Sequence, residues 1–206
     1  MALDLRSLVA PEHTALVTQE CQVGVIGDAA VLRDLADAAQ AVAVPNMARL
    51  TAAARAAAVP VVHCLAVRRA DDRGSNTNAR LFAGTRKLGI RIEPGSREAA
   101  LLPELGLQPD DLVLQRLHGL GPMGNTDLDP VLRNLGVTTI VGIGVSVNIA
   151  MTNFAMDAVN AGYQFVLPRD AVAGHPAEYA DAVIDNTLAL IATIVTTDDL
   201  LGAWGT

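Results

Sequence analysis

The stretch that most constrains the fold is residues 138–151, which read TTIVGIGVSVNIAM. Its β-branched run ends in glycine and leads into a segment with helical spacing, Asn148 to Asn160, which predicts a buried strand followed by a helix. In α/β proteins, ligands bind outside the carboxyl ends of such strands, where unpaired N–H groups of the helix start can face them. The residue that this turn presents is Ala150, whose side chain has no reactive group.

The rest of the chain alternates between strand and helix patterns. Apolar runs predict further strands at 13–18, 60–67, 111–115 and 163–167, and apolar residues at helical spacing predict helices at 29–41, 46–58, 126–134 and 176–195. Pro45 is expected to start the second of these helices, and Gly136 to end the third. The alternation predicts a single domain, residues 1–206, with a three-layer α/β/α fold around a central parallel sheet of roughly six strands.

Composition limits the class of protein. The 206 residues are 51% hydrophobic but only 3% aromatic, so a core has to be built from Ala, Val, Leu and Ile. A net charge of -7 and the lack of a basic or aromatic-basic stripe argue against binding to nucleic acid or to an anionic membrane. The N-terminus lacks a signal-peptide pattern, no apolar run reaches membrane-spanning length, and two cysteines are too few for a disulfide framework. We therefore expect a reduced, cytoplasmic protein.

Three informative positions follow the ends of predicted strands. Glu20 follows the first strand, Arg116 follows the third, and Ala150 lies at the start of the helix after the fourth. Because parallel strands present their carboxyl ends at one edge of the sheet, we expect these three residues to line one pocket.

The segment 68–95 is long for a plain connection and is rich in Arg, Asp, Asn and Gly. Leu81-Phe82 is its only bulky apolar pair. Long loops of this kind often act as lids or as surfaces for partners. The short basic pairs Arg68-Arg69 and Arg86-Lys87 are interpreted as solvated loop charges.

Several short motifs occur in a characteristic order. They are an apolar run followed by Glu20-Cys21-Gln22, then Val44-Pro45-Asn46, Gly124-Asn125-Thr126-Asp127-Leu128, the turn from Gly144 to Ala150, Asp157-Ala158 with Gly162-Tyr163, and Arg169-Asp170-Ala171. In this order and spacing the chain, from about Thr14 to about Leu200, resembles the isochorismatase-like hydrolases. This cysteine hydrolase family includes nicotinamidases, N-carbamoylsarcosine amidohydrolases and isochorismatases.

The resemblance places the family's catalytic Asp, Lys and Cys at Glu20, Arg116 and Ala150. The Cys attacks amides in most of the family, and an alanine cannot form the thioester. Arg116 stays protonated, so it cannot shuttle a proton as a Lys might, but it can bind a carboxylate in bidentate fashion. Glu20 can still act as a general acid or base. The isochorismatases proper also lack the Cys and hydrolyse a vinyl ether by protonating its double bond, a reaction that needs an acid, an anion binder and space.

The residues expected around the substrate are Gln22, His118, Asn148 and Ile149. The backbone N–H groups of Ile149 and Ala150 are expected to form an oxyanion hole beside a cis peptide. Asn148 is interpreted first as a helix cap. His118 is either a polar lining residue or a second acid or base.

The remaining candidates are assigned structural roles. His63 lies inside a strand and is interpreted as a buried core histidine. Cys21 and Cys64 are expected to pack in the core, and Ser146 to be a turn hydroxyl. His175, in the loop after the fifth strand, is a weaker site candidate.

Two functional hypotheses remain open. In the first, the chain is a hydrolase that acts on a small carboxylate-bearing molecule by acid catalysis, without a Cys nucleophile. In the second, it is a catalytically silent family member that binds a small ligand or a protein partner, and Glu20 and Arg116 form a structural ion pair. The loop that carries metal ligands in nicotinamidases has no histidine here, and Asp71 with Asp72 is a weak metal site, so we predict no metal and no cofactor. A homo-oligomer, dimer or tetramer, is expected from the resemblance.

Overall fold

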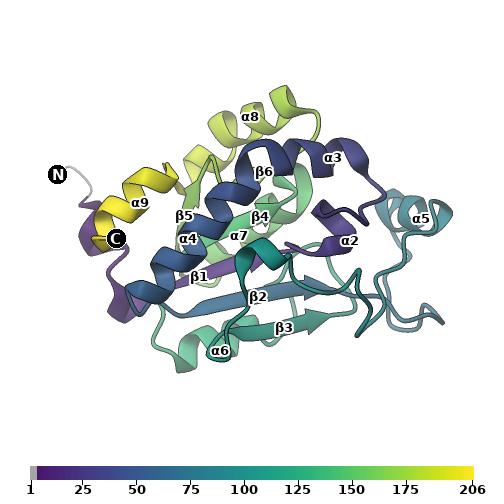
Figure 1. Ribbon diagram of the computed structural model, residues 1–206, viewed down its shortest axis with the longest axis horizontal. Helices are drawn as coiled ribbons and strands as arrows, with labels where there is room; N and C mark the ends of the chain where they lie inside the picture. The colour runs from purple at the N-terminus through teal and green to yellow at the C-terminus, as the bar shows by residue number, and fades with distance from the viewer. Residues whose placement is uncertain (1–3) are drawn as a thin grey trace.

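In the computed structural model, which describes residues 4–206, seven parallel strands form one sheet (Figure 1). Residues 1–3, part of the N-terminus considered above for a signal peptide, lie outside the described residues. The strand order is β3-β2-β1-β4-β5-β7, and β6 pairs with β4. The strands are β1 (Thr14–Gln19), β2 (Val61–Ala66), β3 (Leu112–Arg116), β4 (Thr139–Val145), β5 (Gln164–Pro168), β6 (Val172–Ala173) and β7 (Thr193–Val195). The predicted parallel sheet is confirmed.

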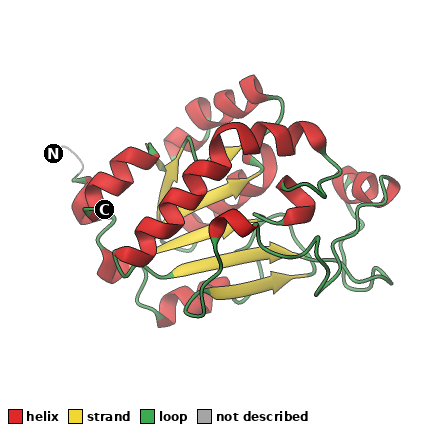
Figure 2. Cartoon of the chain, viewed as in Figure 1, coloured by secondary structure: helices red, strands yellow, loops and turns green. Residues whose placement is uncertain are grey.

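Helices cover both faces of the sheet (Figure 2). They are α1 (Leu5–Leu8), α2 (Val23–Ile26), α3 (Arg33–Ala38), α4 (Val44–Ala56), α5 (Arg80–Lys87), α6 (Leu128–Asn134), α7 (Thr152–Asn160), α8 (Ala177–Asn186) and α9 (Thr197–Trp204). Gly136, with φ of +73°, follows the end of α6 as predicted. Within residues 4–206, no helix combines the length and the apolar character that crossing a membrane requires.

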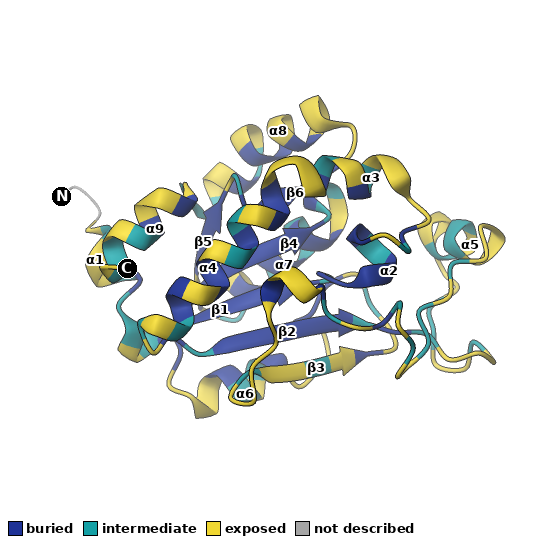
Figure 3. Ribbon diagram, viewed as in Figure 1, coloured by how far each residue is buried: buried dark blue, intermediate teal, exposed yellow. Residues whose placement is uncertain are grey.

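The core consists of two apolar clusters, one on each face of the sheet. Leu16 of β1 packs in the first cluster with residues of α4 and α9, whereas its neighbours Ala15 and Val17 pack in the second with residues of α6, α7 and α8. Figure 3 shows β1, β2, β4 and β5 buried between helices whose outer faces are exposed, whereas the edge strand β3 is largely exposed. Because helices cover both faces of the central strands, successive side chains are buried on opposite faces, and these strands read as continuous apolar runs in the sequence.

The helices predicted at 29–41 and 46–58 form one continuous rod. Between α3 and α4 lies a π-helical turn, Ala39–Ala43, and the backbone stays helical through it. Pro45 lies in the first turn of α4. Proline has no N–H to donate, so it loses one helical hydrogen bond, and the wider π turn before it accommodates the interruption without ending the helix.

The helix predicted at 176–195 is correct only in its first half. The helix α8 ends at Asn186, a 3₁₀ turn follows at Leu188–Leu190, and Thr193–Val195 is strand β7. The residues of β7 are all β-branched, and they pair in parallel with β5. Pairing with an open strand therefore overrides a helical pattern that the sequence carries through this stretch.

Candidate functional site

The first site residue lies where β1 ends. Glu20 has a φ of +54°, in the left-handed region. Cys21 then enters the core and is fully buried, whereas Glu20 lines a pocket. Gly144 of β4 lies beside this turn with a φ of +123°, and a Cβ there would collide with the backbone carbonyl of Gln19. A glycine at 144 therefore allows β4 to lie close against the end of β1.

The other two expected residues line the same pocket. Arg116 is the last residue of β3, and Ala150 lies in a π-helical turn, Val147–Met151, that connects β4 to α7. The peptide bond Val145-Ser146 before this turn is cis. Glu20, Arg116 and Ala150 together line a pocket of about 250 Å³ at the carboxyl edge of the sheet. The topology thus brings the three positions together as expected.

The guanidinium of Arg116 is buried but only partly hydrogen-bonded. Its side chain is 6% exposed, against 20% for Glu20. Its Nη2 donates to Glu20 Oε1 and, at 3.5 Å, to the Leu120 carbonyl. Within residues 4–206, its Nε and Nη1 have no hydrogen-bond partner. Leaving buried donors unpaired costs free energy, so this group is arranged to receive an acceptor from outside the chain.

Of the other predicted substrate-binding residues, two line the pocket and two do not. His118 and Ile149 line it, and both are exposed. Gln22 instead ties β2 to a distant segment, because its side chain bonds the backbone N–H and carbonyl of Ala66 and the carbonyl of Ala99. The structure therefore gives Gln22 a structural position outside the pocket lining.

Asn148 does not cap the helix, so that interpretation is wrong. It lies inside the π-helical turn, and its Nδ2 donates to the carbonyl of His175 at 2.8 Å. Ser146 is the N-cap residue of this turn, but its side chain makes no capping hydrogen bond. Ser146 also lines the pocket. The N–H of Ile149, one of the two expected oxyanion donors, reaches the Ser146 carbonyl at 3.3 Å.

The residues assigned to packing lie in the core. His63 is fully buried, and its Nδ1 is 2.9 Å from Thr18 Oγ1. Burial raises the pKa of both thiols, Cys21 and Cys64, to about 12, so neither is a reactive thiolate. His175, the weaker site candidate, does not pack in the core. It is exposed, and its Nε2 lies 3.6 Å from Asp34 Oδ2.

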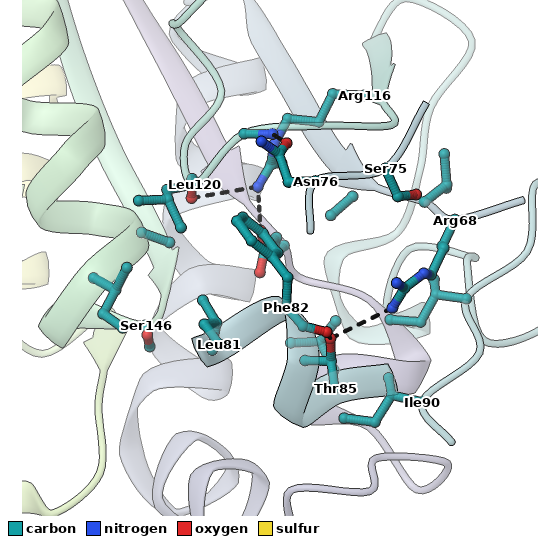
Figure 4. Close-up of a pocket in the computed structure, with 18 of the residues that line it drawn as sticks. Arg68, Ser75, Asn76, Leu81, Phe82, Thr85, Ile90, Arg116, Leu120 and Ser146 are labelled. Carbon is teal, nitrogen blue, oxygen red and sulfur yellow. Dashed lines mark hydrogen bonds and ion pairs between the residues drawn. The ribbon is translucent and has the colours of Figure 1, made fainter. Parts of the chain in front are cut away.

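A large part of the pocket comes from the segment 68–95, the long connection that was expected to act as a lid or as a surface for partners. It contains α5, whose Leu81, Phe82 and Thr85 line the pocket. Figure 4 shows Phe82 projecting toward the guanidinium of Arg116. The apolar pair Leu81-Phe82 in an otherwise polar loop is the sequence feature that could have predicted this apolar side of the pocket.

Arg68 also lines the pocket, so its interpretation as a solvated loop charge is wrong. Its side chain is 14% exposed, and its Nε lies 2.5 Å from Asp72 Oδ1. Its Nη1 donates to Thr85 Oγ1 at 3.4 Å (Figure 4). Among residues 4–206, no group of three or more His, Cys, Asp and Glu side chains is placed to hold a metal ion.

Comparisons with known proteins agree with this architecture. The model of the isochorismatase domain matches residues 14–199. Over 103 residues, 50% of this chain and 54% of the relative, the chain is 32% identical to the uncharacterized isochorismatase family protein YwoC of Bacillus subtilis (strain 168). Over 115 residues, 55% of this chain and 50% of the relative, it is 26% identical to the ureidoacrylate amidohydrolase RutB of Agrobacterium fabrum (strain C58 / ATCC 33970). The matches thus span about half the length of these curated relatives.

A solved structure extends the likeness of fold to the whole chain. The cysteine hydrolase from Pseudomonas syringae pv. phaseolicola 1448A superposes with a TM-score of 0.84 at 23% identity, over 100% of this chain and 99% of that one. This superposition shows the same fold, and the domain match over residues 14–199 shows that the chain belongs to the isochorismatase family.

Proposed function

We propose that this chain hydrolyses a small carboxylate-bearing substrate by acid catalysis, without a cysteine nucleophile. The observation that carries the proposal is the buried Arg116 guanidinium, with two nitrogens that have no partner among residues 4–206, at a pocket that also contains Glu20. The unpaired Nε and Nη1 of a permanently charged guanidinium can donate charge-assisted hydrogen bonds to a carboxylate. Arg116 therefore binds and orients the substrate.

Glu20 supplies the proton in this proposal. It is the one carboxyl group among the described residues that line the pocket. When a substrate carboxylate joins Glu20 on the same guanidinium, two negative charges share one positive charge, and the pair favours taking up a proton. Binding of the anion thus loads Glu20 with the proton that it donates. His118 is exposed at the same pocket and is the histidine among the described residues that line it.

The reaction class that suits these groups is hydrolysis of an enol ether. Glu20 transfers its proton to the terminal carbon of the double bond, and the adjacent carbon becomes an oxocarbenium centre. Water adds to that carbon and returns a proton to Glu20, and the resulting hemiketal collapses to an alcohol and a carbonyl compound. No covalent bond to the enzyme forms. The small side chain of Ala150 leaves room for the substrate in the family's nucleophile position.

One observation favours the second hypothesis, a binding protein without catalysis. Glu20 Oε1 accepts from both Arg116 Nη2 and Gln19 Nε2, the latter at 3.0 Å. A carboxylate held by two donors is also what a structural ion pair would have. The two functions differ in whether a bound anion is turned over.

The test uses 2-methoxyacrylate, the simplest enol ether that carries a carboxylate, with release of pyruvate and methanol followed by NMR. We expect turnover by the wild type, and loss of turnover with retained binding in Glu20→Gln. The matched control is Glu178→Gln, an exposed carboxylate on α8, which should leave turnover unchanged. Turnover that survives Glu20→Gln would remove Glu20 from its role, and binding without turnover in the wild type would favour the binding protein.

A further inference from the structure

We infer that the preferred ligand is a carboxylate with a mostly hydrocarbon body, and that Leu81 and Phe82 of α5 select for that body. The inference rests on the proposed function, since it takes the Arg116 end of the pocket as the carboxylate end. It goes further by naming the chemistry of the rest of the molecule. It also assigns a role to the apolar pair in the segment 68–95.

The pocket has an apolar rim. Its five members each keep between 37% and 44% of their surface exposed, and they come from four different segments: Leu32, Leu81, Leu117, Leu120 and Ile149. Exposing large apolar side chains around one cavity is unfavourable in water, and such patches mark sites where an apolar surface binds. Because the cavity below the rim is only about 250 Å³, its occupant is small.

The pocket lining contains two arginines, each paired with one carboxylate of the chain. Arg116 has donors to spare, as described above. Arg68, the second arginine of the lining, lies 2.5 Å from Asp72 and donates from Nη1 to Thr85, but its Nε and Nη2 have no hydrogen-bond partner within residues 4–206. A second anionic group on the ligand would share Arg68 with Asp72.

The polar side chains of the lining offer few free hydrogen-bonding groups. Asn76 accepts from the Gly119 N–H at 2.8 Å, and the Thr85 hydroxyl donates to the Phe82 carbonyl at 3.0 Å. The exceptions include the Ser75 hydroxyl and the Nε and Nη2 of Arg68, which have no partner within residues 4–206. A ligand rich in amide groups would leave most of its donors and acceptors unpaired against the apolar rim, whereas a hydrocarbon body would not.

The apolar wall on α5 has no other use in the described structure. No residue of α5 is buried, and neither Leu81 nor Phe82 belongs to the two core clusters or packs against them. Both side chains lie in the cavity region between Arg116 and Ser146 in Figure 4. Residues that contribute little to folding but line a ligand pocket are well placed to determine specificity, and they can be changed without unfolding the chain.

The experiment measures binding of acetate, butyrate and hexanoate, with hexanamide as the uncharged counterpart, by isothermal titration calorimetry on the full chain. We expect affinity to rise roughly fourfold for each methylene group that becomes buried. Leu81→Asn and Phe82→Ser should each flatten this dependence on chain length, so that hexanoate loses more affinity than acetate does. The matched control is Leu88→Asn, because Leu88 follows α5 and is exposed but does not line the pocket. Thermal unfolding verifies that each variant is folded.

The outcomes separate this inference from the proposed function. Acids that bind equally well whatever their length would overturn the apolar-body inference and leave the role of Arg116 intact. Hexanamide binding as tightly as hexanoate would contradict the carboxylate role of Arg116, whereas a chain-length dependence that persists would still support the apolar wall. A chain-length dependence that Leu88→Asn flattens as much as Phe82→Ser would also overturn the assignment to α5.

Discussion

Two arginine–carboxylate clusters, one around Arg55 and Asp111 and the other around Arg116 and Glu20, differ in how fully they are hydrogen-bonded. In the buried cluster, Asp111 accepts from Arg55 Nε and Nη2 at 3.1 and 2.7 Å and from the Gln108 N–H at 2.8 Å, and it lies 3.4 Å from His63 Nε2. In the pocket cluster, Arg116 keeps two nitrogens without a partner among residues 4–206. The Asp111 carboxylate of the first cluster has its hydrogen-bond partners within the chain, whereas the Arg116 guanidinium of the second does not have all of its partners there.

The difference separates structural chemistry from binding chemistry. Thr18, His63 and Asp111 have the residue types of a nucleophile, a base and an acid, and they are linked in that order. Yet Thr18 and His63 are fully buried, and none of the three lines the pocket of Glu20. A saturated cluster without access holds strands together. A cluster at a pocket whose donors lack partners can use those donors to bind a ligand.

The largest expected effect comes from breaking the buried cluster. Asp111→Ala should lower the free energy of unfolding by about 3–5 kcal/mol, because Arg55 and His63 lose the carboxylate that pairs them. Urea unfolding measures this loss. Glu20→Ala, in the pocket cluster, should cost much less, since Glu20 is partly exposed. Equal losses in the two variants would contradict the distinction between the clusters.

The next effect concerns ligand binding. Arg116→Gln should weaken binding of hexanoate about 10- to 100-fold, the range expected for lost hydrogen bonds to a charged group. Unfolding free energy should change little, because the guanidinium is only partly satisfied in the free chain. Arg55→Gln should have the opposite effect. It should lower the free energy of unfolding and leave hexanoate binding, measured by calorimetry, unchanged. The comparison fails if both variants affect the same quantity.

The buried cluster should also make stability sensitive to acid. Burial holds the pKa of His63 below its ordinary value of 6.5, despite the nearby Asp111 carboxylate. Burial acts to raise the pKa of Asp111, but the hydrogen bonds from Arg55 and the Gln108 N–H bring it below 3.8. Both groups therefore bind protons more weakly in the folded state. Their stabilisation is present above these values and is lost as pH falls, first below 6.5 for His63 and then below 3.8 for Asp111.

Unfolding free energies measured from pH 7 to pH 3 check this dependence. In His63→Gln, the decline that begins below pH 6.5 should become shallower than in the wild type. His175→Gln is a suitable control, because His175 is exposed. A control variant that flattened the profile equally would show that His63 is not the source.

The smallest effect is expected from the nucleophile position. Ala150→Cys adds one thiol at a pocket wall, and we expect iodoacetamide to label that thiol while Cys21 and Cys64, with pKa values raised to about 12 by burial, stay unlabelled in native protein. Mass spectrometry counts the labels. We expect no amidase activity from this variant, because Arg116 cannot exchange a proton. Amide hydrolysis by Ala150→Cys would show that the rest of the amidase machinery is intact.

Local patterns in the sequence predicted where the main strands lie along the chain and that they run parallel to one another. Apolar runs covered on both faces are recognisable without a structure, and the parallel arrangement follows from their alternation with helices. For that reason Glu20, Arg116 and Ala150 could be assigned to one pocket from three separate strand ends. The resemblance in short motifs led to the same family that the domain match shows.

Only the tertiary structure decided the contacts between residues that are distant in the chain. The helical pattern at 193–195 gave way to a strand because β5 offered an open edge. The link between His63 and Asp111 spans 48 positions, and the apolar wall of α5 acquires meaning only when the segment 68–95 folds over the pocket. Local propensity is encoded in neighbouring residues, whereas hydrogen-bond saturation and pocket lining depend on which distant groups meet, and that is set by packing.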